Sequence, residues 1–226
     1  MNRHTTNPGT PGAITWAHWW PSIRDGLGVV ALFALAIWLT RHYESAVHDI
    51  LAGHALAGIA LFFLTSVIAV LAPMASNLAL VPAFVLVWGP WWTALVLLAG
   101  WIVGAALSFS LGRRARALIL RHFPSARRHA GIDRLIHPRH RMASLILLRM
   151  TFPVDVLSYA LGLFSARTTV LENALSTAVG AAPFALLFSI LPALSGTTQL
   201  VVFVVSALLF VAYAFWIMNR RVDYDP

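Results

Sequence analysis

The sequence predicts an all-α polytopic membrane protein. In this fold an inverted repeat of two re-entrant hairpins, each followed by a transmembrane helix, contributes to about five spans in total. Three observations lead to this class. The chain is 59% hydrophobic and only 11% charged, whereas soluble domains are about 45–50% apolar. Residues 50–112 and 173–219 contain no Asp, Glu, Lys or Arg. Helix-breaking residues interrupt the apolar stretch 73–90, which lies within the first of these segments, and a proline and two charges interrupt the apolar stretch 142–166.

Each charge-free segment is long enough for two helices of about 20 apolar residues, the length that crosses a bilayer. The remaining charge is basic, with a formal net charge of +8, and all 16 basic Lys/Arg positions are arginine. A basic balance suits nucleic acid or anionic lipid, and the hydropathy favours lipid, so no nucleic-acid partner is expected. The absence of cysteine excludes disulfides and cysteine-based metal sites.

The N-terminal part divides into a tail, 1–25, and two helices within 26–72. Trp16, Trp19 and Trp20 have helical spacing just before the first apolar run, which is typical of an interfacial anchor. The alternative is a loose tail with incidental aromatic residues. The run 26–40 is short for a span and either crosses or lies in the interface, so the side of the N-terminus stays open.

The basic segment 113–141 sets the orientation of the rest. It holds nine arginines and four histidines against one acid, Asp133. The positive-inside rule places it in the cytoplasm. The segment 196–226 consists of a final span and a basic C-terminus, and Arg220 and Arg221 place that C-terminus on the same side. Two clean spans, 169–191 and 200–218, separate these markers. Residues 142–166 therefore cannot cross as well, and we expect them to enter and return as a re-entrant hairpin.

The stretch 73–90 contains Pro73, Asn77, Pro82 and Pro90, and proline breaks a helix interior. A break inside the membrane must be covered by protein or line a cavity. If 53–72 and the span 91–112 both cross, this second hairpin enters from the opposite face, which completes an inverted repeat over 73–195. The alternative is a set of kinked ordinary helices.

Two charges inside 142–166 are the strongest candidates for function. Arg149 and Asp155 each cost about 2.5–3.5 kcal/mol at the centre of a membrane helix, and they flank Pro153. A direct Arg–Asp pair would lower both costs. Pro153 would start a second half-helix, with Asp155 in its first turn. The alternative is that Asp155 only caps this helix while Arg149 reaches the cytoplasmic surface.

Neighbouring residues give weaker signals. Ser158 and Tyr159 could extend a polar face from Asp155, and Gly162 is expected to end the half-helix as a left-handed cap. Gly100 and Gly104, with Ser108, form a stripe of small residues typical of tight helix packing.

The arginines that follow the span 91–112 suggest a basic interfacial helix. They either set the topology alone or capture a lipid phosphate. These candidates are Arg113, Arg114, Arg116 and Arg121. The nine histidines are scattered, and the one close pair in the basic segment lies among arginines, so no metal site and no cofactor are expected. Motifs of hydrolases and ATP-driven pumps are missing, so the chain is not expected to be an enzyme.

Two stretches resemble the DedA / VTT-domain family, also called SNARE-associated Golgi proteins. The first runs from Trp88-Gly-Pro-Trp-Trp92 to Gly112-Arg-Arg-Ala-Arg116 and resembles the family's glycine-rich span with its Gly-Arg-x-x-Gly-Arg signature. The second is Arg149-Met-Thr-Phe-Pro-Val-Asp-Val-Leu-Ser-Tyr-Ala-Leu-Gly-Leu163, followed by Gly180-Ala-Ala-Pro-Phe184. It resembles the family's Arg…Pro-Phe-Asp…Asn-Tyr-Ala-x-Gly-Leu segment and the family's later Gly-x-x-Pro turn. Three positions depart from these motifs. Ala115 stands where the first motif has a glycine, Pro153 is single where the family often has two prolines, and Val154 replaces the usual phenylalanine.

The resemblance implies a similar fold and the movement of lipids between leaflets, in a bacterial inner membrane. The cargo it implies is a polyprenyl-phosphate carrier lipid or a phospholipid. The functional residues it implies are Arg149 and Asp155, and secondarily Arg113. The sequence is therefore interpreted as a lipid translocase of the flippase or scramblase kind, with anionic lipids as partners and protons as a second possible partner. The alternatives are a proton-coupled transporter of a small ion or solute and a membrane scaffold without transport.

Overall fold

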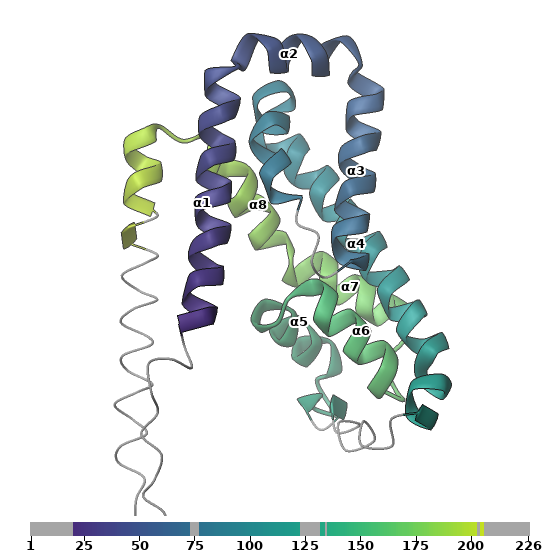
Figure 1. Ribbon diagram of the computed structural model, residues 1–226. Helices are drawn as coiled ribbons and strands as arrows, with labels where there is room; N and C mark the ends of the chain where they lie inside the picture. The colour runs from purple at the N-terminus through teal and green to yellow at the C-terminus, as the bar shows by residue number, and fades with distance from the viewer. Residues whose placement is uncertain (1–19, 73–76, 123–131, 134, 203, 206–226) are drawn as a thin grey trace, which may run out of the picture.

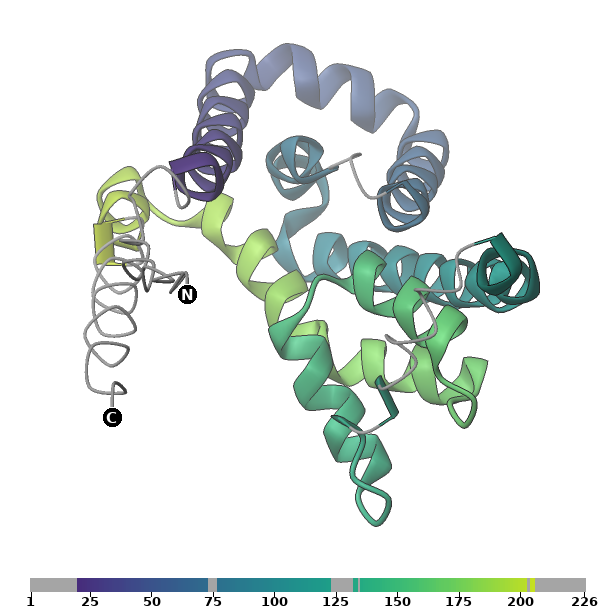
Figure 2. The ribbon, with the colours of Figure 1, turned by 60° about the horizontal axis from the view of Figure 1, so that its bottom comes forward.

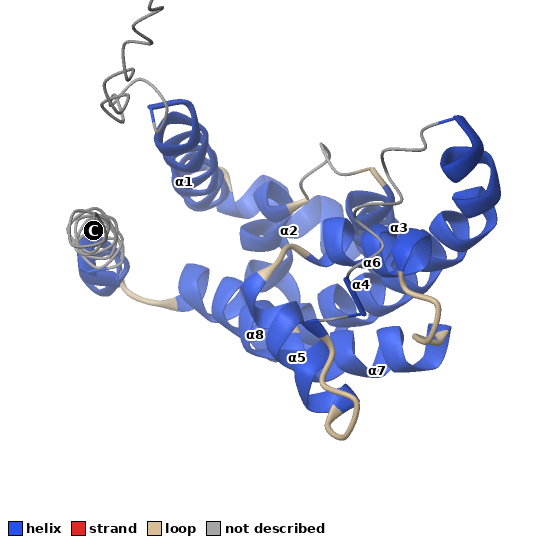
Figure 3. Cartoon of the chain, turned by 90° about the horizontal axis from the view of Figure 1, so that it is seen from below, coloured by secondary structure: helices blue, strands red, loops and turns tan. Residues whose placement is uncertain are grey.

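The computed structural model describes residues 20–72, 77–122, 132–133, 135–202 and 204–205. Within these ranges all regular structure is helical and no strand occurs (Figure 3), which confirms the all-α class. The helices are α1 (Trp20–His42), α2 (Glu44–Gly53), α3 (Ala55–Leu71), α4 (Val81–His122), α5 (Arg141–Thr151), α6 (Val154–Phe164), α7 (Val170–Gly180) and α8 (Ala182–Ile190), with short 3-10 turns η2 (Leu78–Leu80) and η4 (Leu191–Ala193).

Two helical stretches are long and apolar enough to cross a membrane, Leu78–Ile119 and Val170–Ala193. A third exists if Glu44–Leu51 and Ala55–Leu71, which meet at a bend of 99°, count as one broken span. The described residues therefore hold two or three of the five spans that the sequence predicts. Trp16, Trp19 and most of the predicted last span, 200–218, lie outside the described residues.

Helices α1, α2 and α3 form an arch around the beginning of α4 (Figures 1 and 2). Helix α2 lies across the top of this arch in Figure 1, at a steep angle to α3. Near the junction of α1 and α2, Arg41 donates hydrogen bonds to the carbonyls of Leu194 and Pro192, at 2.7 and 3.4 Å. These bonds hold α1 against the segment that follows α8.

Helix α4 is two arms joined by a sharp turn at Gly89. Gly89 has φ 76° and ψ 168°, a conformation that residues with a side chain rarely adopt. Pro90 follows, and because it has no N–H it suits the start of a new helix. The first arm covers 81–88 and the second covers 90–122. The second arm continues past Gly112 to His122, so the predicted span and the first part of the basic segment are one helix.

The contacts along α3 give the directions of the two arms. Asn77, just before the first arm, donates to the Ser66 hydroxyl at 2.6 Å, and Trp88 at its end lies against Gly58. The first arm thus runs antiparallel to α3. Gly100 packs on Ser66 and Gly104 on Val70, so the second arm runs parallel to α3.

We call α3 and the two arms of α4 the first unit. The hairpin predicted at 73–90 was expected to return to the face from which it started. In the structure, Leu71 and Trp88 lie at opposite ends of α3, and α4 reverses direction at Gly89. The described part of 73–90 is therefore a single arm that pairs with α3 and ends at the turn at Gly89.

Helices α5, α6 and α7 form a second unit with the same arrangement. Arg141 at the start of α5 donates to the carbonyl of Arg167, just after α6, at 2.7 Å. The two ends of the segment 141–167 therefore meet, and α5 and α6 run in opposite directions. Arg141 also contacts Glu172 at the start of α7, while Arg149 contacts Gly180 at its end, so α5 and α7 run side by side in the same direction.

The two units pack through α4 and α6. A Cβ at Gly162 would collide with the backbone carbonyl of Phe109, and one at Gly112 would meet the carbonyl of Tyr159 at 3.0 Å. Arg116, one turn after Gly112, reaches the carbonyl of Ser165 at 3.3 Å. Helix α6 thus runs along the second arm in the same direction. Because α6 is the middle helix of its unit and the second arm is an outer one, the two units run in opposite directions.

Candidate functional site

The candidate site lies at the break between α5 and α6. Helix α5 ends at Thr151, Phe152 is extended, and Pro153 is the N-cap of α6. Proline disfavours helical geometry in the residue before it and has no N–H to lose at a helix start. The sequence prediction is confirmed here: Pro153 precedes the second half-helix, and Asp155 lies in its first turn.

Arg149 is the largest fully buried side chain among the described residues, with 2% of its surface exposed. It sits in the last turn of α5. One terminal nitrogen, Nη1, donates to the carbonyl of Val154 at 2.7 Å and to the hydroxyl of Ser158 at 3.0 Å. The other, Nη2, donates to Oδ1 of Asn173 at 2.6 Å. These bonds connect α5, α6 and α7 through one guanidinium.

Asn173 completes this network and was missed by sequence reasoning. It is fully buried, and its Nδ2 donates to the carbonyl of Ala105 in α4 at 3.0 Å. Its carboxamide therefore orients Arg149 relative to the second arm of α4. The available signal was that Asn173 is the one amide side chain in the predicted span 169–191.

Gly180 explains how a full arginine fits between α5 and α7. A Cβ at Gly180 would lie 2.8 Å from Cβ of Arg149 and 3.1 Å from the carbonyl of Ile146. Both contacts are too short, so any larger residue here would push α7 away from α5. Gly180 therefore allows the guanidinium to reach the centre of the second unit.

Asp155 does not form the direct pair that the sequence suggested. Among the described residues no hydrogen bond or ion pair within 4.0 Å joins it to Arg149; its charge acts on the guanidinium through space. Asp155 is half-buried. The prediction of contact was wrong because neutral oxygens of Val154, Ser158 and Asn173 take up the Nη groups of Arg149.

The other candidates of α6 fall into two groups. Ser158 belongs to the network, since it accepts from Arg149 and donates to the carbonyl of Val154 at 2.6 Å. Tyr159 faces the first unit instead, where its hydroxyl donates to the carbonyl of Leu71 at 2.8 Å. Gly162 does not end the helix: α6 continues to Phe164, and the absent side chain allows close contact with α4.

The basic candidates lie at the far end of α6. Arg113 packs over the Phe109 ring and donates to the carbonyl of Thr168 at 2.7 Å, and Arg116 reaches Ser165. These two arginines therefore hold the loop between α6 and α7. Arg114 and Arg121 are exposed. Arg113 belongs to this loop contact rather than to the Arg149 network.

Two features of the Arg149 network matter chemically. The Nε of Arg149 is buried without a hydrogen-bond partner, and the acceptors of its Nη groups are all neutral oxygens. The guanidinium therefore carries a positive charge with no carboxylate within hydrogen-bond distance, and its Nε has no acceptor. Such a group can bind an anion if the covering helices part. No cluster of three or more potential ligands in the described ranges could hold a metal ion.

Comparison with known proteins gives one match. A family model described as the VTT domain matches residues 75–194, which contain the second arm of α4, the Arg149 network and α8. No curated protein and no solved structure matches the chain.

Proposed function

Because this chain belongs to the VTT-domain family of DedA and SNARE-associated Golgi proteins, and is therefore an integral membrane protein, we propose that it moves anionic lipids between membrane leaflets. A polyprenyl-phosphate carrier lipid and an anionic phospholipid are the cargo classes that fit. The observation that carries the proposal is the buried guanidinium of Arg149, whose Nε has no partner.

We propose the following placement in the membrane. In each unit the first two helical segments form a re-entrant hairpin, α3 with the first arm of α4 and α5 with α6. The third segment then crosses, as the second arm of α4 and as α7 with α8. The opposite directions of the units support an inverted repeat of this kind. The basic segment 113–141 lies in the cytoplasm.

The physical argument for an anionic head group concerns charge. An arginine deep in a membrane protein is costly unless its charge and its N–H groups are satisfied. Here neutral oxygens take up the Nη groups, so the hydrogen bonds are mostly satisfied but the charge is not. A phosphate supplies both a negative charge and acceptors for a guanidinium. Arg149 would thus bind the cargo more strongly during its passage than it binds its resting partners.

Access to Arg149 defines the mechanism. Because only 2% of Arg149 is exposed, the head group can reach it only when α5 or α6 moves away from α7. Asp155 is half-buried in the first turn of α6, beside this path. Its negative charge repels the negative phosphate, so Asp155 favours release of the head group. Alternatively, it carries a proton to the leaving head group. The hydrocarbon tail stays in the bilayer throughout.

The test is a leaflet-exposure assay in liposomes that contain the purified chain. Wild-type protein should expose a fluorescent phosphatidylglycerol from the inner leaflet to an impermeant reductant. Arg149→Gln should abolish this movement at equal protein content, and Arg139→Gln, a matched change at an exposed arginine outside the candidate site, should not. Full movement in Arg149→Gln would contradict the proposal. Uptake of a small solute without lipid movement would favour a proton-coupled transporter.

A second test concerns the placement. Cysteines introduced at Ala143 and Ala166 should react with an impermeant reagent from the same membrane face, because the ends of the α5–α6 pair meet at Arg141 and Arg167. Labelling from opposite faces would contradict the re-entrant hairpin.

A further inference from the structure

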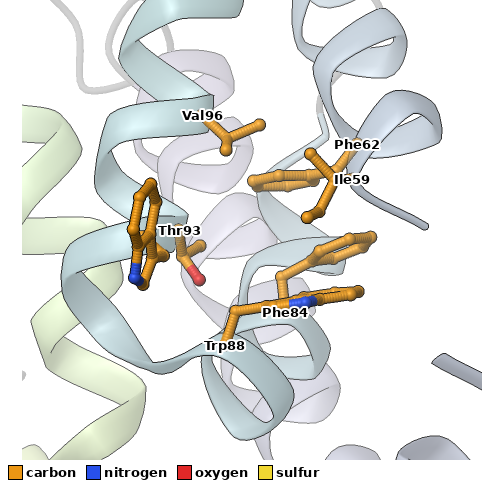
Figure 4. A pocket seen from close by; sticks show the side chains of 7 residues that line it. Ile59, Phe62, Phe84, Trp88, Thr93 and Val96 are labelled. Carbon is orange, nitrogen blue, oxygen red and sulfur yellow. The ribbon is translucent and has the colours of Figure 1, made fainter. Parts of the chain in front are cut away.

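The first unit contains an apolar cavity beside the turn of α4 at Gly89, lined by residues far from Arg149 in the sequence. It has a volume of about 200 Å³ and lies between α3 and both arms of α4. Its lining residues are Ile59, Phe62, Phe84, Trp88, Trp92, Thr93 and Val96. Figure 4 shows Phe62, Phe84 and Trp88 stacked on one another, with Val96 above them.

The aromatic wall of this cavity is a stack of three rings. The rings of Phe62 and Phe84 stack with centroids 4.1 Å apart, and those of Phe84 and Trp88 with centroids 4.8 Å apart. Trp88 can lie against α3 because residue 58 is glycine; a Cβ there would come within 2.8 Å of the indole. The cavity is therefore built into the packing of three helical segments.

The cavity continues into a shallow groove on the outer surface of α3 and α4. This groove, of about 350 Å³, shares Ile59, Trp92 and Val96 with the cavity and adds Leu56, Ala60, Phe63, Leu95 and Ala99. The surrounding large side chains are exposed apolar ones, among them Leu56, Leu61, Leu64 and Leu95. On helices that lie within the bilayer, such a surface faces lipid chains, so the groove opens into the hydrocarbon region.

The lining decides the class of occupant. A water molecule in a cavity needs two to four polar partners. The only polar side chain besides the two indoles is Thr93, and its hydroxyl donates to the carbonyl of Gly89 at 2.8 Å. A hydrocarbon chain, by contrast, gains dispersion contacts with every wall and reaches the cavity directly from the bilayer.

We propose that this cavity and groove bind one hydrocarbon chain of the transported lipid. The assignment to the transported lipid rests on the proposed function, whereas the binding of a chain can be measured independently of transport. The turn at Gly89 and the loop held by Arg113 and Arg116 lie at opposite ends of the second arm of α4. The groove would thus hold the tail at the end of the molecule away from the basic segment.

Binding is tested by photo-crosslinking in liposomes with a phosphatidylglycerol that carries a diazirine in one acyl chain. In the wild type, label should concentrate on 56–63 and 92–99. Ala99→Phe, which fills the groove, should lower this label about ten-fold, as expected for losing the burial of about two methylene groups. The matched control is Ala57→Phe, at an exposed alanine of α3 outside the lining, and it should leave the label unchanged.

Label spread evenly over the exposed faces of α3 and α4, or unchanged in Ala99→Phe, would overturn the site. A shift of Ala99→Phe to a smaller oligomer would overturn it too, since the groove would then be covered by a second copy. The link to transport is tested by chain length. Ala99→Phe should slow movement of a long-chain phosphatidylglycerol but not of its dibutyryl analogue, and equal slowing would refute the link. If wild-type protein moves neither lipid, the proposed function fails while the crosslinking result stands.

Discussion

The two units share one arrangement of helices and differ in what they bury at the centre. The first unit buries aromatic rings and a neutral hydrogen bond from Asn77 to Ser66. The second buries the guanidinium of Arg149, bonded to Asn173. A neutral centre is stabilised by packing and local hydrogen bonds. A buried charge also needs acceptor oxygens from the surrounding helices, as Arg149 has from Val154, Ser158 and Asn173. This difference is in keeping with the proposal that the first unit holds the apolar part of a lipid and the second its head group.

The largest expected effect concerns the contact that joins the units. Gly162→Ala places a Cβ against the backbone of Phe109 and Arg113, which cannot yield as a flexible side chain does. We expect a loss of about 3 kcal/mol in the free energy of unfolding, as for overpacking of a tight core. Thermal unfolding in detergent measures this, and Gly53→Ala, where a Cβ meets nothing within 4 Å, is the control. Equal stability of the two variants would refute the close packing of the units.

The next effect compares the two buried asparagines. Asn173→Ala removes the partner of a charged Nη and the hydrogen bond to the carbonyl of Ala105, so we expect a loss of about 2–3 kcal/mol in stability. Asn77→Ala should cost about 1 kcal/mol, because the Ser66 hydroxyl still donates to the carbonyl of Phe62. Equal losses in chemical unfolding would show that the second unit does not depend on its charge.

A smaller effect is expected for the polar contact between the units. Tyr159→Phe deletes the hydrogen bond from the tyrosine hydroxyl to the carbonyl of Leu71 and keeps the ring. We expect about 1 kcal/mol of lost stability, the usual net value of one neutral hydrogen bond. A loss as large as that of Asn173→Ala in the same unfolding experiment would place the main polar connection at Tyr159 instead.

The smallest effect on stability is expected for Asp155. Because this carboxylate makes no contact with Arg149 and acts on it only through space, Asp155→Asn should change the free energy of unfolding by less than about 1 kcal/mol. Comparison of its unfolding curve with that of Asn173→Ala checks this. A loss of about 3–5 kcal/mol, typical of breaking a buried ion pair, would indicate that Asp155 and Arg149 form a direct ion pair after all.

The sequence located the break between α5 and α6 because its signals are local. Pro153 excludes a continuous helix, and the two charges that flank it stand out in an apolar stretch. The partners of Arg149 could not be located in this way. Asn173 lies 24 residues away in the chain, and nothing in the sequence around it distinguishes a buried hydrogen-bond partner from a residue that faces lipid.

Two glycines show the same limit. Gly89 was read as part of a hairpin, yet its positive φ makes it the point where α4 reverses. Gly162 was read as a helix cap, yet it lies inside α6 against α4. Glycine suits both a left-handed turn and a close approach of two helices. Only the tertiary contacts decide between these uses.

The central claim is that the buried charge of Arg149 selects an anionic head group. The most direct measurement compares initial rates of transbilayer movement for phosphatidylglycerol and phosphatidylcholine with the same acyl chains, in liposomes of wild-type protein and of Arg149→Gln. Wild-type protein should move the anionic lipid faster by about ten-fold or more, a difference of about 1.4 kcal/mol, and Arg149→Gln should lose this preference. A preference that persists in Arg149→Gln would contradict the claim.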